Sequence, residues 1–250
     1  MVSVCMATHN GEKFLRAQID SILCQLDEGD ELIFSDDGSS DNTIDIISSY
    51  NDRRIHLLKF VQNSDIRKKK HSQNFYYATR NFENALKNAH GDFVFLADQD
   101  DIWLPNRVNK MMNKLKQYDC VMCNLNLIDQ TDKIIKTKYF SENPVPGNIF
   151  LYVLKTRILG CCLAFRKELL NYSLPFPRNL LSHDYWLGCV SITSFNFFFL
   201  DEPLHLYRRT DSNVSTTSSK SRNSLLYKLQ YRLEFYLQFR KFIKNKRNGK

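Results

Sequence analysis

Short apolar runs alternate with amphipathic segments along the first 118 residues. The runs are rich in β-branched and aromatic residues, which favours strands, whereas the segments between them repeat apolar residues at helical spacing. Strand–helix alternation of this kind predicts an α/β domain with a mostly parallel sheet flanked by helices. Residues 64–76 are polar and basic and predict a loop, and Gly91 is expected to end a helix. The predicted strands lie in 2–8, 31–37, 56–63 and 92–101, and the predicted helices in 9–25, 42–50, 78–90 and 104–118.

Carboxylates cluster where two of the predicted strands end. Asp36 and Asp37 follow the second strand, and Asp98, Asp100 and Asp101 follow an apolar run of five residues. Ligands of parallel sheets bind outside the carboxyl ends of the strands, so both clusters are expected on one rim. A hard divalent cation takes oxygen ligands and often substrate phosphates as well. The alternative is a solvated acidic loop, but the apolar run and the second cluster favour a metal–phosphate site.

Composition narrows the class of protein. The chain of 250 residues is 43% hydrophobic, enough for one large domain or a domain with an appendage. Its 7 cysteines show no zinc spacing, and an odd count without a secretory signal predicts reduced thiols in a cytosolic protein. No apolar run reaches the length of about 18 residues that a membrane span needs. Dinucleotide-binding and P-loop glycine motifs are absent.

Six segments together resemble the family-2 glycosyltransferases, most closely a bacterial rhamnosyltransferase-like branch that makes surface polysaccharides. They occur in order over residues 2–215: "VSVCMATHNGEKFLRAQIDSIL", "ELIFSDDGSSDNT", "NFENALKNAHGDFVFLADQDDIWLPNRV", "GCCLAFRKEL", "HDYWLG" and "LYRRTDSNVS". The resemblance implies the GT-A fold over residues 1–219. Within it, residues 1–118 would form the nucleotide-binding half and residues 119–219 the acceptor-binding half, with a basic helical tail at 220–250.

The resemblance also implies which residues hold the donor. Thr8 and the residues just after the first strand, Asn10 among them, would line the nucleotide pocket. Asp37 would accept a hydrogen bond from the pyrimidine N3–H, and Asp98 would lie near the ribose. Asp100 would bind a Mg²⁺ or Mn²⁺ ion that bridges the diphosphate.

The expected reaction needs one further carboxylate, which acts as a base. Inverting transfer is a single displacement through an oxocarbenium-like transition state, so one base must take the proton of the acceptor hydroxyl. The resemblance assigns this role to Asp184. The alternative is that Asp184 is only a first-turn acid of a helix, although the two roles are compatible. His183 either orients its neighbours or contacts the substrate, or it is only a cap or a surface residue. Trp186 is either core or a platform for the acceptor.

Two segments depart from the family pattern. Thr210, in "YRRTDSNVST", stands where the family usually carries a histidine, and Arg208 or Arg209 would replace it at the diphosphate. The basic run "RKKK" at 67–70 falls where the family often has a glycine turn, and a solvated loop is favoured there over a contact with an anionic ligand. The Q-x-x-R-W motif of processive synthases is absent, which favours transfer of one sugar or a few.

The net charge of +8 comes from the tail, because residues 220–250 hold ten of the Lys and Arg residues and one acid, Glu234. The segment 224–250 predicts a helix with leucines broadly on one side and a second stripe of aromatic residues. Such a helix either lies on an anionic membrane surface, which suits a lipid-linked saccharide acceptor, or packs back on the domain. Nucleic-acid binding is not expected, because no recognition motif accompanies the charge.

The sequence therefore predicts an inverting, metal-dependent glycosyltransferase that uses dTDP-rhamnose or a UDP-hexose. It is expected in the cytoplasm or at the inner face of the membrane, in bacterial surface polysaccharide synthesis. One alternative is a non-catalytic nucleotide-sugar-binding or scaffold protein of a polysaccharide assembly complex, which only Thr210 favours. Another is a nucleotidyltransferase, whose glycine-rich basic loop is poorly matched by "ATHNGEKF".

Overall fold

Four parallel strands form the first half of one continuous sheet. The computed structural model describes residues 1–62, 70–145, 158–210 and 225–248. The first half of the sheet has the strand order β3-β2-β1-β4, and each neighbouring pair is parallel, as the strand–helix alternation predicts. The four strands are β1 (Val2–Thr8), β2 (Glu31–Asp36), β3 (Ile55–Lys59) and β4 (Phe93–Ala97).

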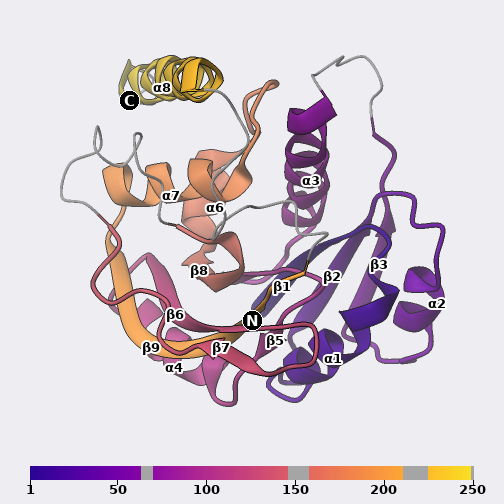
Figure 1. Cartoon of the computed structure of the whole chain (residues 1–250). Helices are drawn as coiled ribbons and strands as arrows, with labels where there is room; N and C mark the ends of the chain where they lie inside the picture. The colour runs from indigo at the N-terminus through magenta and orange to yellow at the C-terminus, as the bar shows by residue number, and fades with distance from the viewer. Residues whose placement is uncertain (63–69, 146–157, 211–224, 249–250) are drawn as a thin grey trace.

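Helices cover these strands, with α3 on one side of the sheet and α1 on the other (Figure 1). Every residue of β2 is buried, and so is nearly every residue of β1. A strand that is buried on both faces needs a continuous apolar run rather than an alternating one, which explains the sequence pattern. The helices of this half are α1 (Glu12–Leu23), α2 (Thr43–Ser48), α3 (Lys70–Lys87) and α4 (Arg107–Leu115).

The second half continues the same sheet but mixes strand directions. Strand β8 runs antiparallel to both β4 and β6, whereas β6 runs parallel to β9. The short β5 pairs with the end of β9, where Trp103 lies opposite His205. The predicted α/β class is therefore confirmed, with the parallel arrangement strictest in the first half. The strands added here are β5 (Ile102–Trp103), β6 (Cys120–Ile128), β7 (Ile134–Lys136), β8 (Leu163–Arg166) and β9 (Phe197–Arg208).

Helix α3 begins earlier than the sequence predicts. The expected loop covers 64–76, yet residues 70–76 are helical, and 63–69 lie outside the described residues. The overlooked signal is a repeat of inward positions, because Tyr76, Thr79, Phe82 and Leu86 are all buried. Steps of three and four residues put these side chains on one face of a helix. The polar residues between them concealed this period.

Gly91 does not end a helix as predicted, because α3 already ends at Lys87. The residue instead permits a close approach between the start of β4 and β1. A Cβ atom at Gly91 would lie 2.8 Å from the carbonyl oxygen of Met1 and 2.8 Å from the amide nitrogen of Ser3. The Gly91 amide also donates a hydrogen bond of 2.7 Å to Ser3 Oγ.

The C-terminal helices stack above the second half of the sheet (Figure 1). The ring of Phe235 on α8 stacks on Tyr185 at 4.0 Å between centroids, and Phe239 and Phe242 meet Trp186 edge-on. Trp186 is fully buried and belongs to the core. Among the described residues, no helix combines the length and apolar content needed to cross a bilayer. These elements are the 3₁₀ turn η1 (Gly160–Cys162), α6 (Lys167–Ser173), α7 (His183–Ser194) and α8 (Leu225–Asn248).

Candidate active site

The carboxyl ends of β1, β2 and β4 meet at one rim. Thr8 is the register partner of Asp36, and Met6 is the register partner of Ala97, which directly precedes Asp98. The Thr8 side chain is buried, and its Oγ1 donates a hydrogen bond of 2.9 Å to Asp36 Oδ1. The predicted pocket residue Thr8 thus braces the rim from inside.

The two neighbouring acids at the end of β2 have different surroundings. Asp36 is buried and accepts hydrogen bonds from Thr8 and from the amide of Ser39. Asp37 is half-buried, and its Oδ2 accepts a hydrogen bond of 2.7 Å from Gln62 Nε2. Burial raises the pKa of Asp37 above its ordinary value. Of the pair, Asp37 is the one with a carboxylate at the surface of the rim.

The turn after β1 is tied to the acidic loop by Gln99, which the sequence reasoning missed. The His9 amide donates a hydrogen bond of 2.9 Å to Gln99 Oε1, and Gln99 Nε2 donates one of 3.1 Å to the His9 carbonyl oxygen. A Cβ atom at Gly11 would lie only 2.5 Å from Gln99 Oε1, so this contact needs glycine. Asn10 has a φ of 49° and accepts the amide of Ser40 at 2.8 Å, which joins the turns after β1 and β2.

Three carboxylates of the loop after β4 crowd one another. Burial and the negative charges of Asp101, Asp100 and Asp184 raise the pKa of Asp98 well above its ordinary value. Burial and the charge of Asp101 raise the pKa of Asp100 to about 7. Burial also raises the pKa of Asp101 to about 7. Like charges held this closely disfavour ionisation, and a bound cation would relieve that cost.

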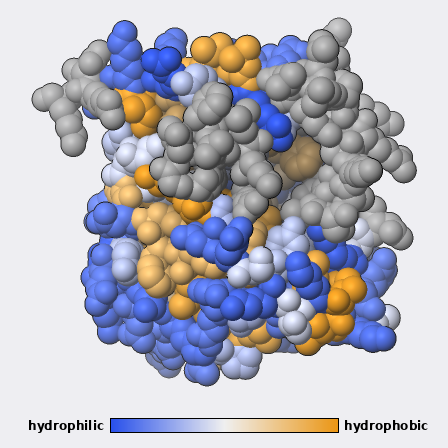
Figure 2. Space-filling model, turned by 60° about the vertical axis from the view of Figure 1, so that its left-hand side comes forward, coloured by the Kyte–Doolittle hydropathy of each residue, from blue (hydrophilic) through white to orange (hydrophobic). Residues whose placement is uncertain are grey.

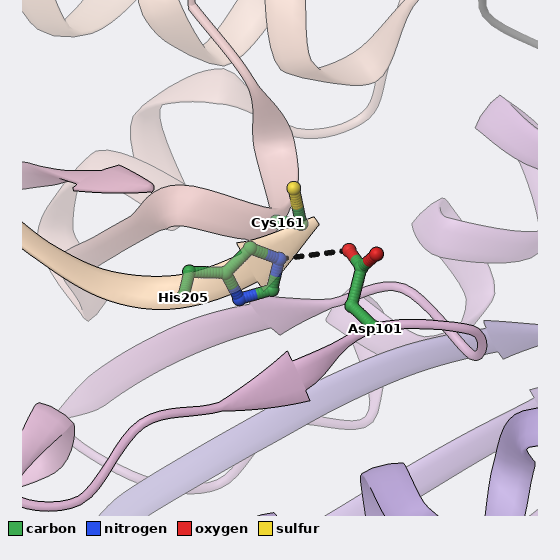
Figure 3. A group of neighbouring side chains, drawn as sticks. All are labelled: Asp101, Cys161 and His205. Atoms are coloured by element: carbon green, nitrogen blue, oxygen red, sulfur yellow. Dashed lines mark hydrogen bonds and ion pairs between the residues drawn. The ribbon is translucent and has the colours of Figure 1, made fainter. Parts of the chain in front are cut away.

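Beneath the rim, Asp101 is held by a buried histidine (Figure 3). His205 Nε2 lies 2.7 Å from Asp101 Oδ2, and His205 Nδ1 lies 2.6 Å from an Arg107 nitrogen. Arginine can only donate, so Nδ1 is the acceptor and the ring proton sits on Nε2, which donates to Asp101. Burial and the Arg107 charge lower the pKa of His205, which agrees with a neutral ring.

A divalent ion fits Asp100, beside Asp98 at the rim, better than it fits the group of side chains beneath them. Asp101, Cys161 and His205 offer ligand atoms within 4.8 Å of one another. The histidine nitrogen that faces Asp101 is already hydrogen-bonded, however, and the Arg107 cation lies on the other side of the ring. Hard cations also prefer carboxylate oxygen to thiol. Asp98 and Asp100 are half-buried at the rim and supply only oxygen.

Arg208 supports the acidic loop from below. Its Nε donates a hydrogen bond of 2.7 Å to the carbonyl oxygen of Asp100, and its backbone amide donates one of 2.8 Å to Asp101 Oδ1. The guanidinium also pairs with Asp132 and lies 4.2 Å from the ring centroid of Phe14. Only 1% of the Arg208 side chain is exposed. Its described contacts are therefore within the protein, and contact with a diphosphate stays a prediction.

Asp184 stands in the first turn of α7. Its Oδ1 accepts the amide of Tyr185 at 2.8 Å and the hydroxyl of Ser182. Within the described part of the chain, no residue hydrogen-bonds its other oxygen, Oδ2. The charge of Asp184 acts on Asp98, so the helix terminus and the strand-end acids share one site.

Gly160 makes room for this arrangement. A Cβ atom there would lie 3.0 Å from Asp184 Cβ and 3.2 Å from His183 Nε2. The His183 ring stacks on Phe82 of α3 at 4.0 Å between centroids, and burial lowers its pKa. His183 therefore packs between two helices, and Gly160 is a site residue that the sequence reasoning missed.

The departures from the family pattern lie partly outside the described residues. Residues 67–69 of the basic run and the stretch after Thr210 are not described. The Arg209 guanidinium lies 5.2 Å from the ring centroid of Tyr207. Replacement of the missing histidine by an arginine stays a prediction.

Comparisons with known proteins agree with this architecture. The profile of Glycosyl transferase family 2 matches residues 3–173. The chain is 26% identical over 249 residues to a dTDP-rhamnosyl transferase, RfbG, of Shigella flexneri, covering 92% of this chain and 81% of that protein. It is 28% identical over 228 residues to the UDP-Glc:alpha-D-GlcNAc-diphosphoundecaprenol beta-1,3-glucosyltransferase WfgD of Escherichia coli, covering 88% and 81%.

Solved structures share the fold at lower identity. TarS of S. aureus (residues 1–349, in complex with UDP-GlcNAc) has a TM-score of 0.66 and 17% identity, and the match covers 92% of this chain. The chain spans 65% of that TarS structure. A mannosyltransferase of Pyrobaculum calidifontis, in complex with GDP-Man and Mn²⁺, has a TM-score of 0.56 and 18% identity, with 85% of this chain and 58% of that one covered. Because the family profile matches more than half of the sequence, the chain belongs to glycosyltransferase family 2.

Proposed function

We propose that this chain moves a hexose from a nucleotide sugar to a saccharide acceptor, with inversion at the anomeric carbon and with a divalent cation bound. The donor is dTDP-rhamnose or a UDP-hexose, and the product belongs to bacterial surface polysaccharide synthesis. Residues 1–118 bind the donor and residues 119–219 bind the acceptor. Two relatives support this choice, since one is named for dTDP-rhamnose and the other for UDP-glucose.

One observation carries the proposal: Gly160 packs against both α7 and β4, because a Cβ atom there would lie 3.0 Å from Asp184 Cβ and 3.7 Å from Leu96 Cδ1. Asp100 lies in the loop after β4, and Asp184 lies at the start of α7, far along the chain. A cation site and a candidate base thus share one rim. Inverting transfer needs these two functions on opposite sides of the reacting carbon.

In the proposed nucleotide-sugar pocket, the carboxylate of the half-buried Asp37 can accept a hydrogen bond from the N3–H of a pyrimidine base. Thr8 and Asn10 hold the surrounding turns. Asp98 directly follows β4, the neighbour of β1 in the sheet, and is assigned to the ribose. A Mg²⁺ or Mn²⁺ ion at Asp100 would stabilise the departing nucleoside diphosphate by charge.

Asp184 is the proposed general base. The hydrogen bonds from Tyr185 and Ser182 both reach Oδ1, which fixes the carboxylate and leaves Oδ2 to take the proton of an acceptor hydroxyl. No covalent nucleophile is needed for a single displacement.

The acceptor is proposed to be a lipid-linked saccharide, reached from the cytoplasm at the inner face of the membrane. The WfgD relative is named for a diphosphoundecaprenol-linked acceptor, which supports this choice.

The test uses the purified chain with UDP-, dTDP- and GDP-sugars in the presence of Mn²⁺ or Mg²⁺. We expect metal-dependent binding of one donor, followed by slow hydrolysis without acceptor and faster transfer with it. Asp184→Asn should bind the donor as the wild type does and lose about 10²–10⁴-fold in turnover. Asp100→Ala should lose the metal-dependent part of donor binding.

Asp27→Asn is the matched control, because Asp27 is exposed at a turn away from the rim. This variant removes one negative charge, as Asp184→Asn does. It should behave as the wild type. Donor binding without turnover, even with lipid-linked acceptors, would support the non-catalytic alternative. Absence of any metal-dependent nucleotide binding would overturn the proposal.

A further inference from the structure

Helix α8 has a fixed inner face. Phe235 and Phe239 are buried against α7, and Phe242 meets both Trp186 and Tyr172. These contacts use aromatic side chains at helical spacing, so they set the rotation of α8 on the domain. The aromatic stripe predicted from the sequence therefore packs back on the protein, and the opposite face of the helix points away from the domain.

That outward face combines leucine with positive charge. Leu233 and Leu237 are 58% and 57% exposed. Arg240, Lys241 and Lys244 are exposed as well. At about 100° of rotation per residue, these five side chains span about 100° of the helix and point about half a turn away from the buried phenylalanines. Figure 2 shows apolar surface beside hydrophilic surface at the top of the molecule, where α8 lies.

The outward face of α8 contains little negative charge. The one acid described on α8, Glu234, lies at its edge and accepts a hydrogen bond of 3.1 Å from Gln230 of the same helix. Three cations beside two exposed leucines give a surface that suits an anionic, partly apolar partner.

The composition distinguishes between two kinds of partner. Protein interfaces are enriched in aromatic residues and arginine and depleted of lysine. On α8 the phenylalanines face inward, and the outward face offers two leucines, two lysines and one arginine, with no aromatic side chain among these five residues. Exposed apolar residues among cations are typical of helices that lie in the headgroup region of anionic bilayers.

We propose that this outward face of α8, formed by Leu233, Leu237, Arg240, Lys241 and Lys244, binds the surface of a bilayer that contains anionic lipids. The bound helix also positions the site. Its Phe235 stacks on Tyr185, which directly follows Asp184. The first turn of α7 is thus anchored to the membrane-bound helix. The binding itself does not depend on the proposed sugar transfer.

The experiment measures cosedimentation of the full chain with phosphatidylcholine vesicles that contain or lack phosphatidylglycerol, without nucleotide sugar. We expect binding only to the anionic vesicles. The double variant Leu233→Ser/Leu237→Ser and the triple variant Arg240→Gln/Lys241→Gln/Lys244→Gln should each lower the partition coefficient by about 10-fold or more.

The matched control is Lys59→Gln/Lys87→Gln/Lys116→Gln, which removes the same charge from exposed lysines on other elements. It should keep most of the binding. Equal losses in the control and the α8 triple variant, or full binding by the leucine variant, would overturn the proposal. Hydrogen exchange of the wild type gives a second measurement, in which anionic vesicles should slow exchange in α8. No change there would also contradict the proposal, and neither failure would affect the sugar-transfer test.

Discussion

The Nε2 atom of His205 lies 2.7 Å from a carboxylate oxygen of Asp101, and both side chains are fully buried. This bond joins β9 to the loop that carries the proposed metal ligand. Arg107 approaches the other ring nitrogen, so the histidine separates a buried cation from a buried anion and satisfies both. The arrangement makes His205 a positioning residue for the acidic loop.

We predict that His205→Leu lowers the free energy of unfolding by about 3–5 kcal/mol, because it leaves both buried charges without their shared partner. His205→Gln keeps a donor and an acceptor in nearly the same place and should lose much less. Urea unfolding measures both. His56→Leu is the control, since that histidine is half-exposed on the edge strand β3. Equal losses for His205→Leu and His205→Gln would show that only ring packing matters.

A second prediction concerns Gly160. An alanine there would bring Cβ to 3.0 Å from Asp184 Cβ, so the first turn of α7 must shift. A displaced base lowers turnover, and we expect Gly160→Ala to lower kcat by about 10-fold while the donor KM stays near the wild-type value. Steady-state kinetics on the identified donor separates the two constants.

The control for this prediction is Gly29→Ala, because a Cβ at Gly29 meets nothing within 4 Å. It should leave kcat unchanged. A Gly160→Ala variant with normal kcat would show that Asp184 either tolerates the shift or is not the base.

Much of this site could be predicted because its signals are local in sequence. The apolar run before Asp98 and the acids after it mark a buried strand, and the structure places the end of this strand beside the ends of β1 and β2. Local patterns also gave the four parallel strands. The start of α3 was missed because polar residues interrupt its apolar period.

The partners of these residues could not be predicted in the same way. His205 is 104 positions away from Asp101, and nothing near either residue announces the contact. Gln99 and Gly160 have roles only because other segments fold against them. Arg208 matched a family motif, yet whether its guanidinium would face a ligand or the protein depends on Phe14 and Asp132, which lie far away in sequence.

A third prediction separates the two groups that could hold a metal. If Asp100 binds the ion, Mn²⁺ at about 100 times its dissociation constant should stabilise the chain by about 2.7 kcal/mol. Asp100→Asn should abolish this stabilisation, and Cys161→Ser should keep it. Thermal unfolding with and without Mn²⁺ measures the shift. Loss of the shift in Cys161→Ser would place the ion at Asp101, Cys161 and His205 instead.

The last prediction concerns stability in acid and rests on Glu31. Burial opposes ionisation of this carboxylate, but hydrogen bonds from Ser3 and His90 outweigh burial and lower its pKa. The Ser3 hydroxyl lies 2.5 Å from Glu31 Oε1, and the His90 amide lies 2.7 Å from the same oxygen. A group whose pKa is lower in the folded state adds stability above its unfolded pKa of about 4.3, and that stability is lost as the pH falls through the folded value.

Glu31→Gln should therefore cost about 1–3 kcal/mol of unfolding free energy at pH 7, because the amide cannot accept all of these bonds as a carboxylate does. The difference from the wild type should shrink as the pH is lowered below the unfolded pKa of the glutamate, since the wild type then loses the same charge. Glu28→Gln is the control, because Glu28 pairs with Arg53 on the surface and such pairs add little. Urea unfolding from pH 7 downward measures this difference, and a gap between Glu31→Gln and the wild type that does not narrow in acid would show that the carboxylate acts by shape rather than by charge.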